Sequence, residues 1–374
     1  MFKQHSFSLV LAGRLTLGCA AEGAEPPPDP SYDEQSDALL PDICTQPAQA
    51  FAGLSYTGKV AWDAPSGRLA FLSSGRFPEG ALASKHREFH FRPGPNVKTI
   101  VICKNVTVTG HFVADHQLTI RGRDRKTSVI YGTDVVDWSH AGGRHYNAWE
   151  YPAIAGVGSG ATITVRNLTV RNARSYAVSG WDQRIDVERV DFIHDRPNDD
   201  NGSNSDGVQG ADGSVVRDSY FNVGDDAIKL YNDMTVENVV IDLQRNGAPI
   251  QLGWDRFGSR SAKGTFKNLT INGVSNSGQY NLGVFSWVSD GGAGGVKTVD
   301  IDGFVVNGLQ LAKRWNGDGW EPYPLVQVGN VSAGQLRVNI NGARVATGQF
   351  GKTTRTGDFV ACGSRARAAS YSCP

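Results

Sequence analysis

A six-residue strand pattern recurs along this chain from about residue 98, and it constrains the fold more than any other feature. The copies read CKNVTV at 103–108, VRNLTV at 165–170, VERVDF at 187–192, VRDSYF at 216–221, VENVVI at 236–241, FKNLTI at 266–271 and IDGFVV at 301–306. Each copy is too short to bury its own apolar face, so successive copies must stack on one another.

The spacing of the copies is roughly 20 residues in the middle of the chain and longer elsewhere. Gly and Asn stand at the bends, and no amphipathic helix lies between copies. A β-sandwich also contains many short strands, but it does not require such similarity from copy to copy. We therefore expect an all-β chain in which residues 98–374 form a right-handed parallel β-helix and residues 43–97 form a short N-terminal cap.

The first 42 residues differ from the rest. Residues 1–21 resemble an export signal, because Lys3 is followed by short apolar runs. The triplet LGC at 17–19 is similar to a lipoprotein attachment box, which makes Cys19 a candidate lipid anchor, although Arg14 interrupts the apolar run and Thr16 stands where an aliphatic residue is usual. Residues 22–42 are acidic and Pro-rich, as in a disordered linker. We expect a secreted or extracytoplasmic protein, with a surface-anchored lipoprotein as the alternative, and no membrane span.

The formal net charge is zero, with 37 acidic and 37 basic residues. Seven acids and two bases lie in residues 1–42, which leaves 30 acids and 35 bases in the remainder. This mild positive balance does not indicate nucleic-acid binding. It is compatible with a neutral or an acidic polysaccharide as partner, and we expect the protein to be a monomer.

Five cysteines are present, and four remain if Cys19 is removed or lipidated. An even number in an exported protein suggests two disulfides, and four cysteines allow three connectivities. The local pair Cys362–Cys373 is our preferred prediction, and Cys44–Cys103 would then be the second. No cysteine or histidine cluster has zinc spacing, so we expect no structural metal.

An asparagine recurs at one position of the repeat, as Asn105, Asn167, Asn238 and Asn268. Three of these also match the Asn-x-Thr acceptor pattern for glycosylation. A buried asparagine ladder at a corner of the β-helix explains the periodicity better than glycosylation does.

A second repeated segment, small–aliphatic–variable, follows at 177–179, 207–209, 227–229, 249–251 and 283–285. Side chains alternate along a strand, so the aliphatic member should face the core and its neighbours should face outward. Gln209, Lys229 and Gln251 should then form a stacked polar row on the outer surface. Shortly after these segments comes a row of aromatic residues that could support sugar rings or pack under loops, namely Trp181, Tyr231, Trp254 and Trp287.

Three aspartates occupy equivalent places in two successive copies, within NSDGVQ at 204–209 and VGDDAIK at 223–229. Parallel strands lie about 4.8 Å apart. Asp206 should therefore stand beside Asp226, and Asp225 should join them if Gly224 makes a bend. Repulsion within such a cluster raises at least one pKa and provides a proton donor.

Two other interpretations of these aspartates remain open. Asp-Asp and Asp-Gly are common in turns, and a carboxylate cluster can bind calcium. The match of both segments in register, with Gln209 and Lys229 alongside, favours catalysis. We therefore predict Asp206, Asp225 and Asp226 as catalytic residues, and we expect no metal and no cofactor.

The motifs NSDGVQ, VGDDAIK and NGAPIQLGW at 246–254 resemble glycoside hydrolase family 49, the dextranases and isopullulanases, within the pectin lyase-like β-helix group. The resemblance is convincing over about residues 160–290. It implies an inverting hydrolase that cleaves within an α-glucan such as dextran or pullulan. By position, Asp225 would be the general acid, and Asp206 and Asp226 would activate water. We predict contacts to the polysaccharide from Asn204, Gln209, Lys229, Tyr231, Gln251, Trp254, Trp181 and Trp287.

Two departures from known patterns qualify the resemblance. Members of family 49 usually carry a sizeable β-sandwich before the β-helix, whereas only about 50 residues stand at that place here. Polygalacturonases share the Asp…Asp-Asp arrangement but add Gly-His-Gly and Arg-Ile-Lys motifs, which this sequence lacks. Hydrolysis of another polysaccharide, pectin-like or sulfated, is the enzymatic alternative. A carbohydrate-binding β-helix without activity is the other, although it has no reason to cluster like charges.

Overall fold

The structure is a computed structural model that describes most of the chain between residues 42 and 345. The described residues are 42–78, 90–132, 152–158, 160–173, 175–196, 205–245, 247–273, 275–276, 283–288, 293–307, 311–313, 320–322, 325–329, 333–345 and 370–372. The predicted export signal, nearly all of the predicted linker, Cys19, Asn204 and the predicted pair Cys362–Cys373 lie outside these residues.

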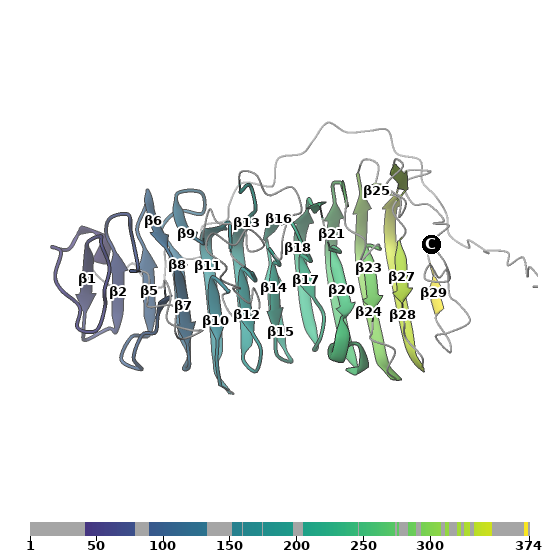
Figure 1. The fold of residues 1–374 in the computed structure, drawn as a ribbon, viewed down its shortest axis with the longest axis horizontal. Coiled ribbons are helices and arrows are strands. Elements are labelled where there is room, and N and C mark those ends of the chain that lie inside the picture. Colours follow the sequence, from purple (N-terminus) through teal and green to yellow (C-terminus); the bar gives the residue numbers. More distant parts are fainter. Residues whose placement is uncertain are drawn as a thin grey trace, which may run out of the picture.

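The described residues form β-strands, with two short 3-10 helices, η1 (Ile43–Thr45) and η3 (Asp255–Ser259). The first and largest sheet follows the long axis of the molecule (Figure 1). Its main path is β1 (Val60–Asp63), β2 (Arg68–Phe71), β5 (Thr99–Ile102), β8 (Leu118–Gly122), β11 (Thr162–Arg171), β13 (Arg184–Ile193), β15 (Ser214–Arg217), β18 (Met234–Ile241), β21 (Ala262–Ile271), β24 (Ala293–Val306), β28 (Ala333–Val345) and β29 (Ser370–Ser372). Four further strands join it, namely β3 (Gly75–Arg76), β6 (Val106–Thr109), β9 (Ser128–Tyr131) and β16 (Tyr220–Asn222).

A second sheet runs alongside the first and carries the segments with the aspartates. In chain order its strands are β4 (His90–Phe91), β7 (His111–Ala114), β10 (Ile154–Gly156), β12 (Val178–Gly180), β14 (Val208–Gly210), β17 (Ile228–Lys229), β20 (Ile250–Gly253), β23 (Phe285–Val288) and β27 (Val326–Gly329). A third, smaller sheet contains β19 (Gln244–Arg245), β22 (Ser275–Asn276), β25 (Leu311–Lys313) and β26 (Trp320–Pro322).

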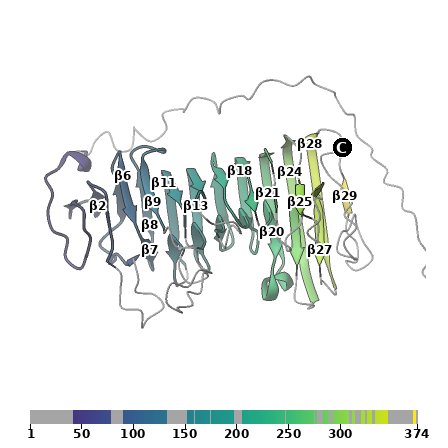
Figure 2. The ribbon, with the colours of Figure 1, turned by 45° about the horizontal axis from the view of Figure 1, so that its top comes forward.

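Neighbouring strands in the first two sheets are parallel along nearly the whole molecule, and each is about one coil further along the chain than the last. In the second sheet, for example, Val178 pairs with Val208, Val208 with Ile228, and Ile228 with Ile250. A view turned by 45° shows the coils following one another in sequence order (Figure 2). The predicted all-β, right-handed parallel β-helix is therefore confirmed.

Columns of apolar side chains from both sheets fill the interior of the coils. The second sheet contributes one column and the first sheet a facing one, and all members are buried: Val178, Val208, Ile228, Ile250 and Phe285, and Val165, Val187, Val216, Val236 and Phe266. This burial arises because successive side chains of a strand point to opposite faces, so one face of every coil is apolar. The stacking that the sequence repeat requires is thereby achieved.

The corner between the two halves of each long strand carries a residue with positive φ. Asn167, Arg189, Asp218, Asn238 and Asn268 all have φ between 51° and 54°. Asn tolerates this left-handed conformation better than most residues because its short side chain hydrogen-bonds locally. Asn268 Nδ2 donates to Asn238 Oδ1 at 2.8 Å, and Asn238 Nδ2 donates to Asp218 Oδ1 at 2.8 Å.

The asparagine ladder differs from the prediction in one respect, which is its burial. Asn105, Asn238 and Asn268 are exposed, and Asn167 is half-buried. The corner turns the side chains outward, so they bridge successive coils along the surface instead of in the core. The conformational requirement of the corner, rather than burial, accounts for the periodicity of these residues.

The N-terminal end of the β-helix begins earlier than expected. β2 already pairs in parallel with β5, so the first coil starts inside the region 43–97 that we expected to be a cap. β1 folds back antiparallel onto β2 and covers the end of the sheet. The predicted disulfide Cys44–Cys103 is present, with Cα atoms 5.8 Å apart, and ties η1 to the second coil. None of the described residues belongs to a helix long and apolar enough to cross a membrane.

The corner ladder predicts a measurable contribution of Asn238 to stability. We expect Asn238→Ala to destabilise the fold by about 1–2 kcal/mol, because alanine in the left-handed conformation is strained and two surface hydrogen bonds are lost. Asn238→Gly should cost less, since glycine adopts positive φ freely. Urea midpoints of the two variants test this expectation, and equal midpoints would contradict the role of φ.

Candidate active site

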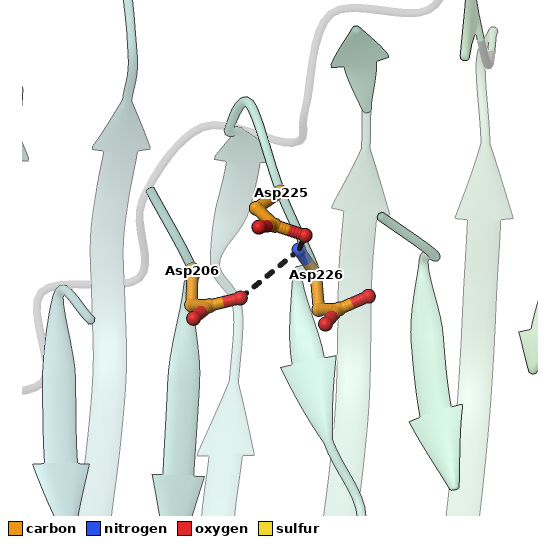
Figure 3. A group of neighbouring side chains, drawn as sticks. All are labelled: Asp206, Asp225 and Asp226. Carbon is orange, nitrogen blue, oxygen red and sulfur yellow. Dashed lines mark hydrogen bonds between the residues drawn. The ribbon is translucent and has the colours of Figure 1, made fainter. Parts of the chain in front are cut away.

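The three aspartates converge at the start of two adjacent strands of the second sheet. Asp206 precedes β14 and Asp226 precedes β17, and the pairing of Val208 with Ile228 places these two aspartates side by side. Figure 3 shows their side chains together with that of Asp225. One carboxyl oxygen from each of the three lies within 4.8 Å of the others. The spatial cluster expected from the repeat is thus present in the structure.

Main-chain contacts hold the cluster in place. The Gly207 N–H donates to Asp226 O at 2.8 Å, and the Asp226 N–H lies 3.2 Å from Asp206 Oδ1 and 3.0 Å from Asp225 Oδ1. The bend that turns Asp225 toward the other two rests on Ser205, whose Oγ accepts from the Gly224 N–H at 2.9 Å. The geometry therefore depends on backbone pairing between coils more than on side-chain conformation.

Lys229 supplies the positive charge within the cluster. Its Nζ lies 3.1 Å from Asp206 Oδ1 and 2.8 Å from Asp226 Oδ2, and it donates to Gln251 Oε1 at 3.2 Å. Its side chain is 3% exposed. A buried charge is costly unless it is paired and hydrogen-bonded, and here each ionised group has partners. The ammonium group is thus within ion-pair distance of the carboxyl groups of both Asp206 and Asp226.

Asp226 accepts from three donors, one on its own coil and two on the next coil. Besides Lys229, Gln251 Nε2 donates to Asp226 Oδ2, and the Ala248 N–H donates to Asp226 Oδ1 at 2.7 Å. Gln251 is itself oriented by the Tyr231 hydroxyl, which donates to Gln251 Oε1. Gln251, Lys229 and Tyr231 therefore form one hydrogen-bonded network with the aspartates.

Asp225 and Asp206 have raised pKa values for the same main reason, which is burial. For Asp225, burial and then the neighbouring charges of Asp206 and Asp226 raise the pKa well above its ordinary value. For Asp206, burial raises the pKa to about 7, with Asp226 adding to the rise and Lys229 opposing it. Burial alone would lower the pKa of Lys229, but Asp206 and Asp226 raise it well above its ordinary value. The cluster can therefore keep a carboxyl proton at neutral pH beside a permanent cation.

One carboxyl oxygen of the cluster is available for a further hydrogen bond. Asp206 Oδ2 is buried and has no hydrogen-bond partner among the described residues. Gln209 Oε1 and Ser179 Oγ, from the same sheet, are also buried and have no hydrogen-bond partner among the described residues. Buried polar atoms in native proteins are usually hydrogen-bonded, often to water. These atoms are therefore the natural contacts for a water molecule or a substrate hydroxyl.

The polar row lies where the alternation predicts but is not on the surface. Gln209 pairs with Lys229 and Lys229 with Gln251, so the stacking is as expected. All three are nonetheless buried. The rings of Tyr176 and Tyr231 stand beside the row, with centroids 5.3 Å and 5.9 Å from Lys229 Nζ. The outer face of the second sheet is thus covered at this point, which the strand pattern alone does not reveal.

The aromatic residues fall into two groups. Trp181 and Tyr231 both stack on Phe257 of η3, with ring centroids 5.4 Å and 4.6 Å apart and interplanar angles of 28° and 5°. Trp181 and Phe257 are half-buried, whereas Tyr231 is buried. Trp254, immediately before η3, is half-buried as well. η3 is the short coiled ribbon beside β20 in Figure 2, and these residues contact it or directly precede it in the chain.

The sequence pattern predicted Trp287 at the outer surface, and this prediction is wrong. Its side chain is fully buried, and its indole Nε1 donates to Gly258 O at 2.9 Å. It is therefore placed to hold η3 against the second sheet rather than to contact a sugar. Trp287 pairs with Gly253 rather than with Trp254, and it lies two residues after the core residue Phe285, on the same face of the strand.

Three residues near the cluster were not identified from the sequence. Tyr176 packs beside Lys229, Ala248 donates its N–H to Asp226, and Phe257 stacks on Tyr231. Ala248 lies inside the motif NGAPIQLGW and was detectable there as the residue that follows Asp226 by one coil. Phe257 belongs to a loop between repeats, where no periodic signal exists.

Dextranases are among the known proteins that are similar to this chain. No family model matches the chain. A dextranase of Arthrobacter sp. (strain CB-8) is 41% identical over 185 residues, which cover 45% of this chain and 28% of the relative. A dextranase of Arthrobacter globiformis is 22% identical over 207 residues, covering 50% and 30%. The chain therefore spans less than a third of the length of these dextranases.

Among solved structures, Dex49A from Penicillium minioluteum matches with a TM-score of 0.52 and 16% identity, covering 89% of this chain and 58% of that one. At this identity the match concerns the fold, and it agrees with the parallel β-helix. Together with the two sequence matches, it confirms the resemblance to dextranases that the aspartate motifs predicted.

The electrostatics of the cluster can be tested without any activity assay. We expect Lys229→Gln to raise the pKa of Asp206 above its present value of about 7, because the opposing cation is lost while burial and Asp226 remain. The measurement is a titration of ¹³C-labelled aspartate carboxyl groups by NMR.

Lys263→Gln is the matched control, because Lys263 is exposed and pairs with Asp300 far from the cluster in sequence. It should leave the carboxyl titration unchanged. An unaltered Asp206 titration in Lys229→Gln would mean that Lys229 does not tune the cluster.

Proposed function

We propose that this dextranase-like protein is a glycoside hydrolase that cleaves within an α-glucan such as dextran. The observation that carries the proposal is the buried cluster of Asp206, Asp225 and Asp226 around Lys229. Glycoside hydrolysis requires one carboxyl group that keeps its proton and another that is ionised. The raised pKa values of Asp225 and Asp206 support a proton donor within this cluster.

Asp225 is our candidate for the general acid. Burial and two neighbouring carboxyl groups raise its pKa well above its ordinary value. In the proposed reaction, Asp225 gives its proton to the glycosidic oxygen as the bond to the anomeric carbon breaks. Asp225 becomes a carboxylate, and the leaving sugar departs with a new hydroxyl group.

Asp206 is our candidate for the general base, and Asp226 for the residue that assists it. Asp206 keeps Oδ2 without a partner among the described residues, whereas both oxygens of Asp226 accept hydrogen bonds. A carboxylate oxygen that is not already hydrogen-bonded can accept the proton of a water molecule as that water attacks the anomeric carbon. Lys229 and Gln251 then fix the two carboxylates relative to each other.

Sugar binding is proposed along the rings beside the cluster. Trp181, Trp254 and Phe257 are half-buried and present apolar faces, and such faces combined with a few polar groups are typical of ligand sites. Gln209 offers an amide oxygen without a partner in the described part of the chain. We also keep Asn204 as a predicted contact, whereas Tyr231, Lys229, Gln251 and the buried Trp287 act in this proposal by supporting the site.

We propose an extracellular location for this hydrolase, because the Cys44–Cys103 disulfide suits an oxidising compartment. Attachment through a lipid at Cys19 and a monomeric state remain predictions of the sequence. A polymer such as dextran does not enter cells, so secretion also fits the proposed substrate class.

The central test is the release of reducing ends from dextran, pullulan and polygalacturonate by the purified protein. We expect release from dextran or pullulan, and a loss of at least about 100-fold in kcat for Asp225→Asn, since removing general acid catalysis typically costs 10²–10⁴-fold. Binding of the polysaccharide should be retained.

The control is Asp182→Asn, which changes an exposed aspartate on the coil before Asp206. It should keep full activity. Release from polygalacturonate alone would move the protein to the pectin-degrading class. Binding without release from any substrate would favour a carbohydrate-binding protein, and retained activity in Asp225→Asn would refute the assignment of the acid.

The stereochemical course is a separate proposal, and we propose inversion from the resemblance to family 49. Inverting enzymes separate the acid and base by about 6.5–9.5 Å to admit water. One carboxyl oxygen of each aspartate lies within 4.8 Å of the others, and the anomer formed first tests the stereochemical course directly. We expect the β-anomer as the first product from an α-glucan, observed by ¹H NMR before mutarotation. An initial α-anomer would show retention instead.

A further inference from the structure

Gly247 lies directly against the acidic cluster from the next coil. It is buried and has φ of +75°, a conformation that side chains other than that of glycine rarely adopt. A Cβ atom at this position would stand 2.4 Å from Asp225 Oδ1, 2.4 Å from Asp226 N and 2.5 Å from Asp225 C. Two of these three atoms belong to the backbone, so the clash cannot be relieved by rotating one side chain.

The segment that contains Gly247 is fixed to the aspartate coil by main-chain hydrogen bonds. The Ala248 N–H donates to Asp226 Oδ1 at 2.7 Å, and the Ala227 N–H donates to Ala248 O at 3.0 Å. The Ile228 N–H donates to Pro249 O at 3.1 Å. Residues 247–249 therefore form a backbone wall whose distance from the aspartates is set by the parallel pairing itself.

We propose that Gly247 is a positioning residue, whose missing side chain lets this wall approach the Asp225 carboxyl group and hold it in the orientation from which it acts as the acid. The inference rests on the proposed function for the role of Asp225. It concerns a residue outside the aspartate cluster that neither touches the substrate nor takes part in proton transfer.

Two physical effects follow from the close approach. The wall excludes water from one side of Asp225, and burial is the main cause of the raised pKa of that carboxyl group. It also prevents the carboxyl group from turning away from Asp206 and Asp226, which face it and raise its pKa further, while Lys229 opposes them. A displacement of about 1 Å in a reacting group can cost about 100-fold in rate.

The experiment compares Gly247→Ala with Gly213→Ala. Gly213 is a matched control because it also has positive φ, +79°, but a Cβ there would meet nothing within 4 Å. Both variants therefore carry the same type of backbone strain, and only Gly247→Ala introduces a contact with Asp225. Neither glycine belongs to the proposed catalytic or binding residues.

We expect Gly247→Ala to lower kcat by about 100-fold with KM changed little, and Gly213→Ala to keep wild-type kcat. In Gly247→Ala the fall of kcat/KM at high pH should begin at a lower pH, because a more exposed Asp225 has a pKa nearer its ordinary value and loses its proton earlier. Equal kinetics and equal pH profiles for the two variants would overturn the proposal.

A second readout is independent of activity. NMR titration of ¹³C-labelled aspartate carboxyl groups, with Asp225→Asn to assign the resonance, should show a lower pKa for Asp225 in Gly247→Ala and no change in Gly213→Ala. If the wild-type protein releases no reducing ends, the proposed function fails, but this titration still tests the position of Asp225. An unchanged titration in Gly247→Ala would refute the inference alone.

A double-mutant cycle covers the case in which Gly247→Ala folds poorly. Replacing the Asp225 side chain by that of alanine removes one of the three clashing atoms, so Gly247→Ala should shift the urea midpoint less in an Asp225→Ala background than in the wild type. Recovery of soluble protein in the double variant would support the proposal in the same way. An equal shift, or equal insolubility, in both backgrounds would show that Gly247 does not act on the Asp225 carboxyl group.

Discussion

The parallel hydrogen bonding between successive coils is the constraint on which the rest of this structure depends. It sets the distance between equivalent residues of neighbouring coils at about 4.8 Å, whatever their side chains are. Asp206 and Asp226 therefore stand side by side because Val208 pairs with Ile228. The same pairing brings Gln251 and the segment 247–249 against Asp226 from the other side. A site built in this way uses backbone rigidity to place groups that would repel one another in a flexible chain.

The cost of this placement is visible in the electrostatics. Three carboxyl groups are buried within a few ångströms of one another, with one lysine as their shared cation. Clusters of this kind destabilise a fold unless each group is paired, and proteins retain them mainly where function requires a shifted pKa. The apolar columns on the inner face of the same strands supply the compensating stability, since Val208 and Ile228 are completely buried one residue away from Gln209 and Lys229.

The sequence predicted the parts of the molecule that obey the repeat. The stacked strands, the convergence of the aspartates, the alignment of Gln209 with Lys229 and Gln251, and the Cys44–Cys103 disulfide all followed from periodicity or from cysteine pairing. The predictions made from the sequence were wrong where coils depart from the repeat. The first coil, β2 and β3, carries no asparagine corner and was assigned to a cap. Trp287 seemed equivalent to Trp254, but it pairs with Gly253 and its side chain is fully buried.

The sequence by itself therefore determined two features. It determined which face of each strand is apolar, because side chains alternate along a strand, and which residues of successive coils are neighbours, because the repeat is fixed. Only the tertiary structure decided what covers the outer face. The burial of the polar row beside Tyr176 and Tyr231, the stacking of Phe257 from η3 on Tyr231, and the approach of Gly247 to Asp225 join segments that share no periodic signal. Such contacts depend on the paths of the turns and loops between coils, and these follow from packing in three dimensions rather than from the spacing of residues.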